Sequence, residues 1–409
     1  MDWLIWIYVV IFFFGIYFLF LFVILYQRHK KQLFDFPIPT EFPEISLIVP
    51  AYNEEKTISG TIEALLNLEY PEGKKEIIIV NDGSKDNTLG VVKGFMKNHK
   101  EIKLLDKKNS GKADSLNKAI NIARGKLIAV SDADSYPEKD CLYKMVGYFE
   151  QDEKVAAVTS KVWAKNNRNF MEKFQEVDYT VIAWSRKILD FIGCVYVTNG
   201  PLSIYRKKVV QKVGGFDPQN ITEDIELTWN LLSHGYKTKM SYSAVVYTLV
   251  PDNFKIWNKQ RIRWNLGGFQ TLNKYRSFFL RGENLFGYFV ITYVGLSFVL
   301  ALIGMFLLLR YFYLKFSPIF YTLPYLFKNY NPFMFFEFNF NLTLLSILGL
   351  MFLVLSVLYH KFAFRKSQLL KKGIVTILIY SFIYRPLYIV PLVMSLYKLI
   401  KGDIRWYTK

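Results

Sequence analysis

Long uncharged apolar runs lie near both ends of the chain. Trp3–Tyr26 holds 24 residues without a charge, and a helix of that length extends about 36 Å, more than the roughly 30 Å core of a bilayer. The run is too long for the apolar part of a signal peptide. No basic residue precedes it and no small-residue cleavage site follows it, so we predict a retained transmembrane anchor over residues 1–27.

Three further runs predict a C-terminal transmembrane region over residues 283–409: Asn284–Leu309, Phe338–Tyr359 and Gly373–Tyr397. Arg385-Pro386 interrupts the last of them. Because a charge is costly in lipid, we expect this arginine to face protein or to mark a break or a re-entrant bend. The aromatic segment Pro318–Phe336 is interrupted by prolines and is predicted to lie at the membrane interface rather than to span it.

The central block, residues 40–282, alternates short β-branched runs with helical stretches and is of single-domain size. This alternation predicts an α/β fold with a mostly parallel sheet wrapped by helices. The predicted strands are Ile45–Val49, Glu76–Val80, Ile102–Asp106 and Leu127–Val130, and the predicted helices are Thr57–Leu68, Thr88–Asn98 and Ala113–Arg124.

Polar residues gather after these strands, at the edge where ligands bind in a parallel sheet. Pro50–Glu55 follows the first strand, Asn81–Ser84 the second and Ser131–Ser135 the fourth, and Lys112 lies in the turn after the third. Asp, Asn and Ser are also the usual N-cap residues of helices, so capping explains any one of these turns equally well. Three such turns along one edge favour a binding site.

The pair Asp132 and Asp134 suits a divalent metal that bridges to a diphosphate, because two carboxylates with phosphate and water complete the oxygen shell of Mg²⁺. Zinc is disfavoured, since the four histidines are scattered and the two cysteines are far apart. A Walker phosphate loop is excluded, because Ala113 follows Gly111-Lys112 and Asp106 stands where its first glycine should be.

Two more motifs lie further along the chain. Thr222–Asp224 opens a predicted helix, and Asp224 there is either a helix cap or a general base. Gln260, Arg263 and Trp264 are spaced i, i+3 and i+4, which places them on one helix face. Their basic, aromatic surroundings are also typical of a helix on a membrane surface.

Composition and charge narrow the class of protein. Hydrophobic residues make up 52% of the chain and aromatic residues 18%, which excludes a disordered chain or a coiled coil. Two cysteines are too few for a disulfide scaffold. A net charge of +18 would suit nucleic acid, but basic clusters at Arg28–Lys31 and Lys361–Lys372 flank the predicted spans. We therefore assign much of the charge to the inner membrane leaflet, where lipids are the partners, and expect no nucleic acid.

The same basic clusters orient the chain, because short loops rich in Lys and Arg stay in the cytosol. This rule predicts an N-terminus outside and a multi-pass protein of the plasma membrane. The domain at residues 40–282, with interfacial helices at its C-terminal end, is then cytosolic.

Taken together, the motifs resemble those of family 2 glycosyltransferases of the GT-A fold. The resemblance is strongest to membrane synthases of the poly-N-acetylglucosamine type, with hyaluronan and cellulose synthases as wider relatives. It covers the soluble domain and the general layout of spans. It rests on the order and spacing of Asn81–Ser84, Asp132-x-Asp134, Thr222–Asp224 and Gln260-x-x-Arg263-Trp264.

The resemblance implies roles for these residues. The nucleotide would be bound by Asp82 with the loop that carries Pro50, Tyr52 and Glu54. The metal, Mg²⁺ or Mn²⁺, and the diphosphate would be held by Asp132 and Asp134, with Lys112 nearby.

For the acceptor side, the resemblance implies that Asp224 is the catalytic base. Gln260, Arg263 and Trp264 would contact the diphosphate and the acceptor sugar. Asn199-Gly200 stands where the family's acceptor loop carries Ser-Gly, which leaves the identity of the acceptor open.

The implied activity is inverting transfer of a sugar from a nucleotide-diphosphate donor, such as UDP-N-acetylglucosamine, to a growing glycan by a processive synthase. The alternative is a single-sugar transferase acting on a polyprenyl or dolichyl phosphate or another lipid acceptor. It shares the N-terminal motifs, but an aromatic platform at Trp264 favours retention of a chain. A catalytically inactive scaffold would have lost motif carboxylates, and all are present. Four spans are few for an export channel, which leaves room for a small membrane helper subunit.

Overall fold

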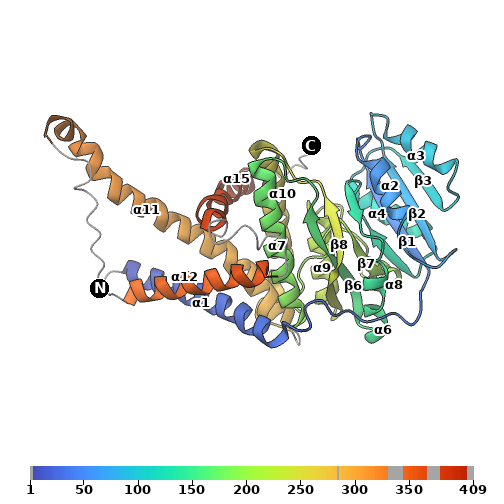
Figure 1. Ribbon diagram of the computed structural model, residues 1–409, viewed down its shortest axis with the longest axis horizontal. Coiled ribbons are helices and arrows are strands. Elements are labelled where there is room, and N and C mark those ends of the chain that lie inside the picture. Colours follow the sequence, from blue (N-terminus) through green and yellow to red (C-terminus); the bar gives the residue numbers. More distant parts are fainter. Residues whose placement is uncertain (1–2, 283–284, 330–343, 366–377, 403–409) are drawn as a thin grey trace. The chain divides into compact units, whose positions relative to one another are not determined.

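A computed structural model describes residues 3–282, 285–329, 344–365 and 378–402 of the chain. The chain forms two compact units, one made of Met1–Ile24 with Tyr293–Phe362 and the other of Leu25–Thr292 with Ala363–Lys409. The larger unit contains the sheet and all the predicted site residues, and the smaller one consists of long apolar helices (Figure 1).

One eight-stranded mixed sheet forms the centre of the larger unit. Its strands are β1 (Ile45–Ala51), β2 (Lys75–Asp82), β3 (Ile102–Lys107), β4 (Leu127–Val130), β5 (Ser135–Pro137), β6 (Val155–Ala164), β7 (Ser203–Arg206) and β8 (Lys237–Thr248). They lie in the order β3-β2-β1-β4-β7-β6-β8-β5. The first four are parallel, and so are β6 and β8, whereas β7 is antiparallel to both of its neighbours, β4 and β6, and β5 is antiparallel to β8.

Both faces of the central strands are buried under helices, because alternate side chains of a strand point to opposite faces. Leu47 of β1 belongs to one core with Ile62 of α2 (Ile58–Leu66), and its neighbour Ile48 belongs to another with Leu116 of α4 (Lys112–Ile122). Strands buried on both faces are continuously apolar, which is why the sequence revealed them.

Seven more helices complete the part of the larger unit around the sheet. They are α3 (Thr88–Met96), α5 (Tyr143–Val146), α6 (Tyr148–Gln151), α7 (Phe170–Asp190), α8 (Lys207–Lys212), α9 (Glu223–Ser233) and α10 (Phe254–Lys274). The helix predicted after Thr222 is α9, and the helix expected to present Gln260, Arg263 and Trp264 is α10.

Every strand and helix predicted between Ile45 and Val130 is present, with ends within two residues of the predicted ones. Four of the seven neighbouring pairs in the sheet are parallel, namely β1–β2, β1–β4, β2–β3 and β6–β8, so the expectation of a mostly parallel sheet is confirmed within a sheet that is mixed as a whole. Because β1 and β2 are longer than predicted, Pro50, Asn81 and Asp82 are strand residues. Pro50 lies beyond Ile48–Val130, the last β1–β4 pair, so its missing N–H costs that ladder no hydrogen bond.

Three helices in the described residues are long and apolar enough to cross a membrane. They match the first three predicted spans. The qualifying stretches are Ile5–His29 in α1 (Trp3–His29), Phe286–Leu307 across the π-helical turn η2 (Phe286–Val290) and α11 (Ile291–Asn329), and Ser346–Phe364 in α12 (Leu344–Phe364). Within the smaller unit the rings of Phe18 and Tyr293 lie 5.0 Å apart and those of Phe22 and Tyr359 5.5 Å apart.

The fourth predicted span is not among these helices. Residues 373–377 lie outside the described part, and the chain beyond Ile379 forms a π-helical turn η5 (Tyr380–Tyr384), α14 (Arg385–Leu387) and α15 (Ile389–Ile400). The irregular helix at Arg385-Pro386 fits the predicted break. η5, α14 and α15 follow one another from Tyr380 to Ile400, so the 12 residues of α15 are the last part of a longer, irregular helical stretch. α15 packs on α10, where Leu399 joins a cluster with Ile262.

The prolines after Leu309 do not interrupt the chain as expected. α11 continues as one helix through Pro318 and Pro324 to Asn329, because a proline inside a helix removes a hydrogen bond and bends the helix more often than it ends it in apolar segments. The rest of that segment, residues 330–336, lies outside the described residues, and its place at the membrane interface stays a prediction.

Candidate active site

The turns after β1 and β2 are fastened to one another at the carboxyl edge of the sheet. The Asn53 N–H donates to Ser84 Oγ at 3.0 Å, and Asn53 Oδ1 accepts from the Lys85 N–H at 2.8 Å. Asn53 has a positive φ of 56°, which asparagine tolerates better than most residues. The Glu54 N–H donates to Thr88 Oγ1 at 2.8 Å. The two turns thus form one rigid rim that carries Tyr52 and Glu54.

Asp82, at the end of β2, holds the turn before α4. Its Oδ1 accepts from the Ser110 N–H at 2.9 Å and from Lys107 Nζ at 2.5 Å, and its Oδ2 accepts from the Gly111 N–H at 2.9 Å. Gly111 has a φ of 94°, a conformation that favours glycine. The side chain of Asp82 is 6% exposed. This carboxylate therefore fixes the backbone that places Lys112 at the start of α4.

Lys112 links two carboxylates from distant parts of the chain. Its Nζ lies 2.7 Å from Asp132 Oδ1 and 2.8 Å from Glu223 Oε1. Burial by itself would lower the pKa of Lys112, but Asp132 and Glu223 outweigh it and raise the pKa, so the ammonium stays charged. Lys112 thus brings together the start of α4, the turn after β4 and the start of α9.

The loop that carries Asn199-Gly200 presses against Asp132. The Asp132 N–H donates to the Gly200 carbonyl at 3.1 Å, and a Cβ on Gly200 would lie 2.5 Å from Asp132 Oδ2. Asn199 Oδ1 accepts from Thr159 Oγ1 at 2.7 Å and also from Arg186 Nη1 of α7. The loop expected to face the acceptor therefore lies directly beside the aspartate expected to hold the metal.

Asp134 follows Asp132 on the turn after β4, and Thr248 Oγ1 of β8 donates to its Oδ1 at 3.4 Å. Among the described residues there is no group of three or more His, Cys, Asp or Glu side chains that could hold a metal ion. Two carboxylates on one turn still fit Mg²⁺ or Mn²⁺, because such an ion takes the rest of its oxygen ligands from a diphosphate and water. Asp132 and Asp134 are the residues that would hold it.

Asp224 is the second residue of α9 and is not its N-cap. Thr222 occupies the cap position, and Asp224 Oδ1 accepts from the adjacent Ile225 N–H at 2.9 Å. Burial raises the pKa of Asp224 to about 6, Glu223 adds to the rise, and Lys112 opposes it. The carboxyl group is thus close in pKa to what a general base at neutral pH needs.

The start of α9 is fastened to α10, which carries the last motif. Asn220 Nδ2 donates to Thr271 Oγ1 at 3.0 Å, and the Ile221 N–H donates to Gln270 Oε1 at 3.0 Å. A Cβ on Gly267 would overlap with Thr222 Oγ1, so glycine permits this close approach. The helix with Gln260, Arg263 and Trp264, which are all half-buried, is thereby joined to the segment that presents Asp224.

Several site residues were missed by the sequence analysis. Glu223 was named only as part of its motif. Lys107 was not considered. Arg186, a charged residue on the mostly buried helix α7, was not considered either. Lys107 could have been found, because it directly follows a predicted strand. The pairing of Glu223 with Lys112 and of Arg186 with Asn199 depends on tertiary packing and leaves no local signal.

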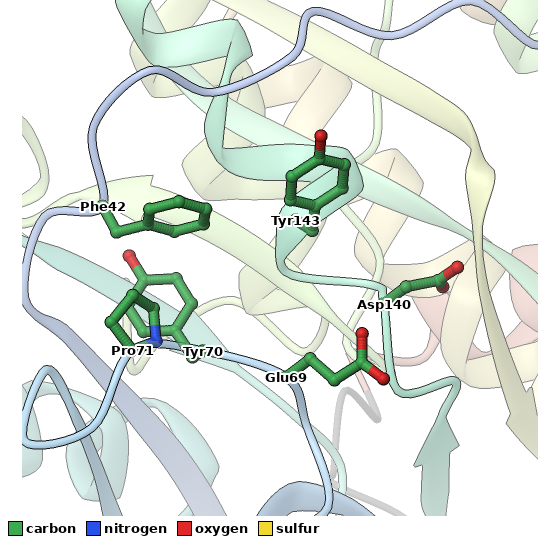
Figure 2. A pocket seen from close by; sticks show the side chains of 6 residues that line it. All are labelled: Phe42, Glu69, Tyr70, Pro71, Asp140 and Tyr143. Carbon is green, nitrogen blue, oxygen red and sulfur yellow. The ribbon is translucent and has the colours of Figure 1, made fainter.

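A separate pocket lies at the other edge of the sheet, where β1 and β2 begin. It has a volume of about 460 Å³, and Figure 2 shows that the rings of Phe42, Tyr70 and Tyr143 and the side chains of Glu69 and Asp140 line it. None of the motif residues lines it. The chemistry of the motif residues therefore belongs to the carboxyl edge alone.

This fold and this group of residues define a glycosyltransferase. The chain matches the family described as glycosyltransferase like family 2 over residues 43–267, more than half of its length, and it belongs to that family.

Two relatives are synthases of one polymer. The chain is 35% identical to the poly-beta-1,6-N-acetyl-D-glucosamine synthase of Staphylococcus epidermidis over 230 residues, which is 56% of this chain and 55% of that protein. It is 35% identical to the enzyme of the same name from Staphylococcus aureus strain COL over 259 residues, 63% of this chain and 62% of that protein. The matches therefore span little more than half the length of these relatives.

A solved structure shows the same fold. The mannosyltransferase PcManGT from Pyrobaculum calidifontis, in complex with GDP-Man and Mn²⁺, is similar with a TM-score of 0.60, at 19% identity, over 97% of this chain and 99% of that one. The larger unit thus has the GT-A fold.

Proposed function

We propose that this chain is a membrane polysaccharide synthase that transfers N-acetylglucosamine from UDP-N-acetylglucosamine to a growing glycan, with inversion and in a processive manner. The observation that carries the proposal is the cluster in which Lys112 bridges Asp132 and Glu223 beside Asp224. The choice of sugar rests on the two relatives, which are named as synthases of that polymer.

The donor would bind along the carboxyl edge of β1, β2 and β4. Three internal hydrogen bonds use three of the roughly four lone-pair sites of the Asp82 carboxylate, so one remains for the nucleotide base. Tyr52 and Glu54 stand on the rim beside it, directly after Pro50. Asp82 would thus serve the nucleotide both by contact and through the turn that it holds.

The diphosphate would lie against the turn that carries Asp132 and Asp134. A divalent metal there, when bound, supplies a Lewis acid for the leaving diphosphate. Lys112 would give its charge to the same oxygens, and Arg263 would approach from α10. Electrostatic stabilisation of this kind is usually the largest contribution to such a transfer.

Asp224 would take the proton from the acceptor hydroxyl as that oxygen attacks the anomeric carbon. Attack occurs on the face opposite the leaving diphosphate, so the configuration is inverted. At pH 7 a carboxyl group with a pKa of about 6 is ionised in about nine of ten molecules. A positioned base contributes about 10²- to 10⁴-fold to the rate.

The acceptor sugar would pack on the indole of Trp264, between Gln260 and the Asn199-Gly200 loop. Aromatic rings suit a sugar because its axial C–H groups form an apolar face. A platform that holds the terminal sugar allows the next donor to bind while the chain stays in place. The membrane helices and the basic clusters beside them support a cytosolic site next to the bilayer.

Membranes that contain the protein, incubated with a panel of radiolabelled nucleotide sugars, provide the test. We expect UDP-N-acetylglucosamine with Mg²⁺ or Mn²⁺ to give a long glycan, and other donors to give little product. A one-sugar lipid as the sole product from every donor would instead identify a transferase acting on a polyprenyl phosphate, and would contradict the proposal.

A further inference from the structure

A buried charge lies inside the motif helix although it is not part of the motif. Arg261 of α10 is 1% exposed. Its guanidinium carbon lies over the ring of Trp264, 4.0 Å from the ring centre, and 5.6 Å from the ring centre of Trp257. One face of the Trp264 indole is therefore covered by a cation.

The same guanidinium contacts a second motif residue. Arg261 Nη1 donates to Gln260 Oε1 at 3.1 Å. Arg261 thus lies against both α10 side chains, Gln260 and Trp264, to which the proposed function assigns the acceptor.

Asp178 of α7 holds Arg261 in place. Its Oδ2 accepts from Arg261 Nη2 at 3.3 Å, and its Oδ1 accepts from the Tyr380 hydroxyl at 2.7 Å. The Tyr388 hydroxyl also donates to Oδ2, and the Tyr388 ring centre lies 5.3 Å from the guanidinium carbon. Asp178 is 4% exposed. One guanidinium and two hydroxyls therefore surround a buried carboxylate, and they tie α7, α10 and the C-terminal helices together.

A buried ion pair is weak support for stability, because the desolvation of both charges offsets most of their attraction. The effect of such a pair that we use here is that it fixes the orientation of the guanidinium group. A planar guanidinium that is fixed on one side by a carboxylate can hold a stacked aromatic ring in one orientation.

We propose that Arg261, anchored by Asp178, is a positioning residue that orients Trp264 and Gln260 toward the acceptor sugar. This inference rests on the proposed acceptor role of Trp264. The acceptor side of the site then depends on the C-terminal helices, because Tyr380 and Tyr388 donate hydrogen bonds to Asp178. These two tyrosines lie 202 and 210 residues from Asp178 along the chain.

The test uses the full-length protein in membranes with radiolabelled UDP-N-acetylglucosamine. Three quantities are measured: the KM for the donor, the length of the glycan, and the ratio of sugar transferred to sugar hydrolysed. For Arg261→Met we expect a donor KM close to that of the wild type. The ratio should fall by about three- to thirtyfold, as the loss of a desolvated cation–π contact predicts.

Three further variants sharpen the result. Arg261→Lys should not restore the ratio, because an ammonium group lacks the plane that stacks on the indole. Asp178→Asn keeps the size and shape of the side chain that holds Arg261 but removes its charge, so the ratio should fall in this variant as well. It tests the positioning role if the Arg261→Met protein does not accumulate. The double variant of Arg261→Met with Trp264→Ala should have the same ratio as Trp264→Ala alone, because the two residues act through one ring.

Lys187→Met is the matched control. Lys187 forms a buried pair with Asp190 on the same helix, at 2.8 Å, but contacts the Met240 carbonyl of β8 instead of α10. We expect it to lower the melting temperature without changing the ratio. The positioning role is wrong if Arg261→Met and Asp178→Asn keep the wild-type ratio. It is also wrong if Lys187→Met, at a similar melting temperature, lowers the ratio as much as they do. If Trp264→Ala itself makes full-length glycan, the proposed acceptor role of Trp264 fails whatever Arg261 does.

Discussion

Asp224 lies between two charged neighbours that act on it in opposite directions. Burial and the charge of Glu223 raise its pKa, Lys112 lowers it, and the net result is a pKa of about 6. As a base, Asp224 works only when ionised, so transfer should rise with pH through the pKa and level off above about pH 7. Since Glu223 raises the pKa, removing its charge should lower it.

A pH profile of transfer by Glu223→Gln tests this directly. We expect the acidic limb to move to lower pH than in the wild type, with a reduced maximum because Lys112 loses one partner. A limb that stays in place, or moves to higher pH, would mean that another group controls the rate.

Asp224 and Asp134 should fail in different ways. Asp224→Asn removes the base but keeps the donor site, so we expect nucleotide binding to persist while transfer falls by at least about 100-fold. Asp134→Ala should lose metal-dependent nucleotide binding as well. Calorimetry with UDP in the presence and absence of Mg²⁺, beside a transfer assay, distinguishes the two. Near-normal turnover of Asp224→Asn would show that Asp224 has no part in the chemistry.

At the scale of elements, the Asn199-Gly200 loop and the turn after β4 approach so closely that a methyl group would disturb them. Gly200→Ala places a Cβ 2.5 Å from Asp132 Oδ2. The carboxylate is the end of a side chain and can rotate away, so we expect the fold to tolerate the change. Transfer should fall by about 10- to 100-fold, because the carboxylate is displaced from its working position.

Gly94→Ala on α3 is the control for this substitution. A Cβ there meets nothing within 4 Å, and alanine in an exposed helix is favourable by about 0.5–1 kcal/mol. Melting curves should show that both variants are stable, and transfer assays should show that only Gly200→Ala has lost activity. Equal activity in Gly200→Ala would mean that the Asp132 position is not critical.

The elements that the sequence predicted are those whose structure depends on local pattern. β1 to β4 are buried on both faces, and the helices between them show apolar residues at helical spacing, as in Ile58 and Ile62. The second half of the sheet, β5 to β8, was not predicted. β5 has three residues, β7 has four, and β8 alternates polar and apolar residues in a sheet whose register is set by its neighbours.

The same distinction separates the site residues that were predicted from those that were missed. Asp82, Asp132 and Asp224 stand in motifs and next to strand or helix ends, so the sequence marks them. Arg261 lies within a motif, but its burial depends on Tyr380 and Tyr388, at the far end of the chain. A charged residue on a basic helix is normally solvated, and only the packing of α7 and the C-terminal helices shows otherwise.

At the scale of the whole molecule, the basic clusters predict which segments are exposed outside the cell. The segment Ser317–Asn331 should be accessible and Lys366–Lys372 should be cytosolic, because short loops rich in Lys and Arg are retained inside. Residues 330–343 and 366–377 lie outside the described part of the chain, so accessibility is best measured by chemical labelling.

Labelling of introduced cysteines has a low background in this protein. Both native cysteines are buried, which raises the pKa of each thiol to about 12 and keeps it unreactive.

Asn331→Cys and Ser367→Cys provide one probe for each side. With a membrane-impermeant maleimide on intact cells, we expect Asn331→Cys to be labelled and Ser367→Cys to be protected. After permeabilisation Ser367→Cys should be labelled as well, which shows that protection came from the membrane and not from burial. The wild type, with only Cys141 and Cys194, should stay unlabelled throughout. Labelling of Ser367→Cys in intact cells would place the catalytic unit outside, away from cytosolic nucleotide sugars, and would contradict both the orientation and the synthase that depends on it.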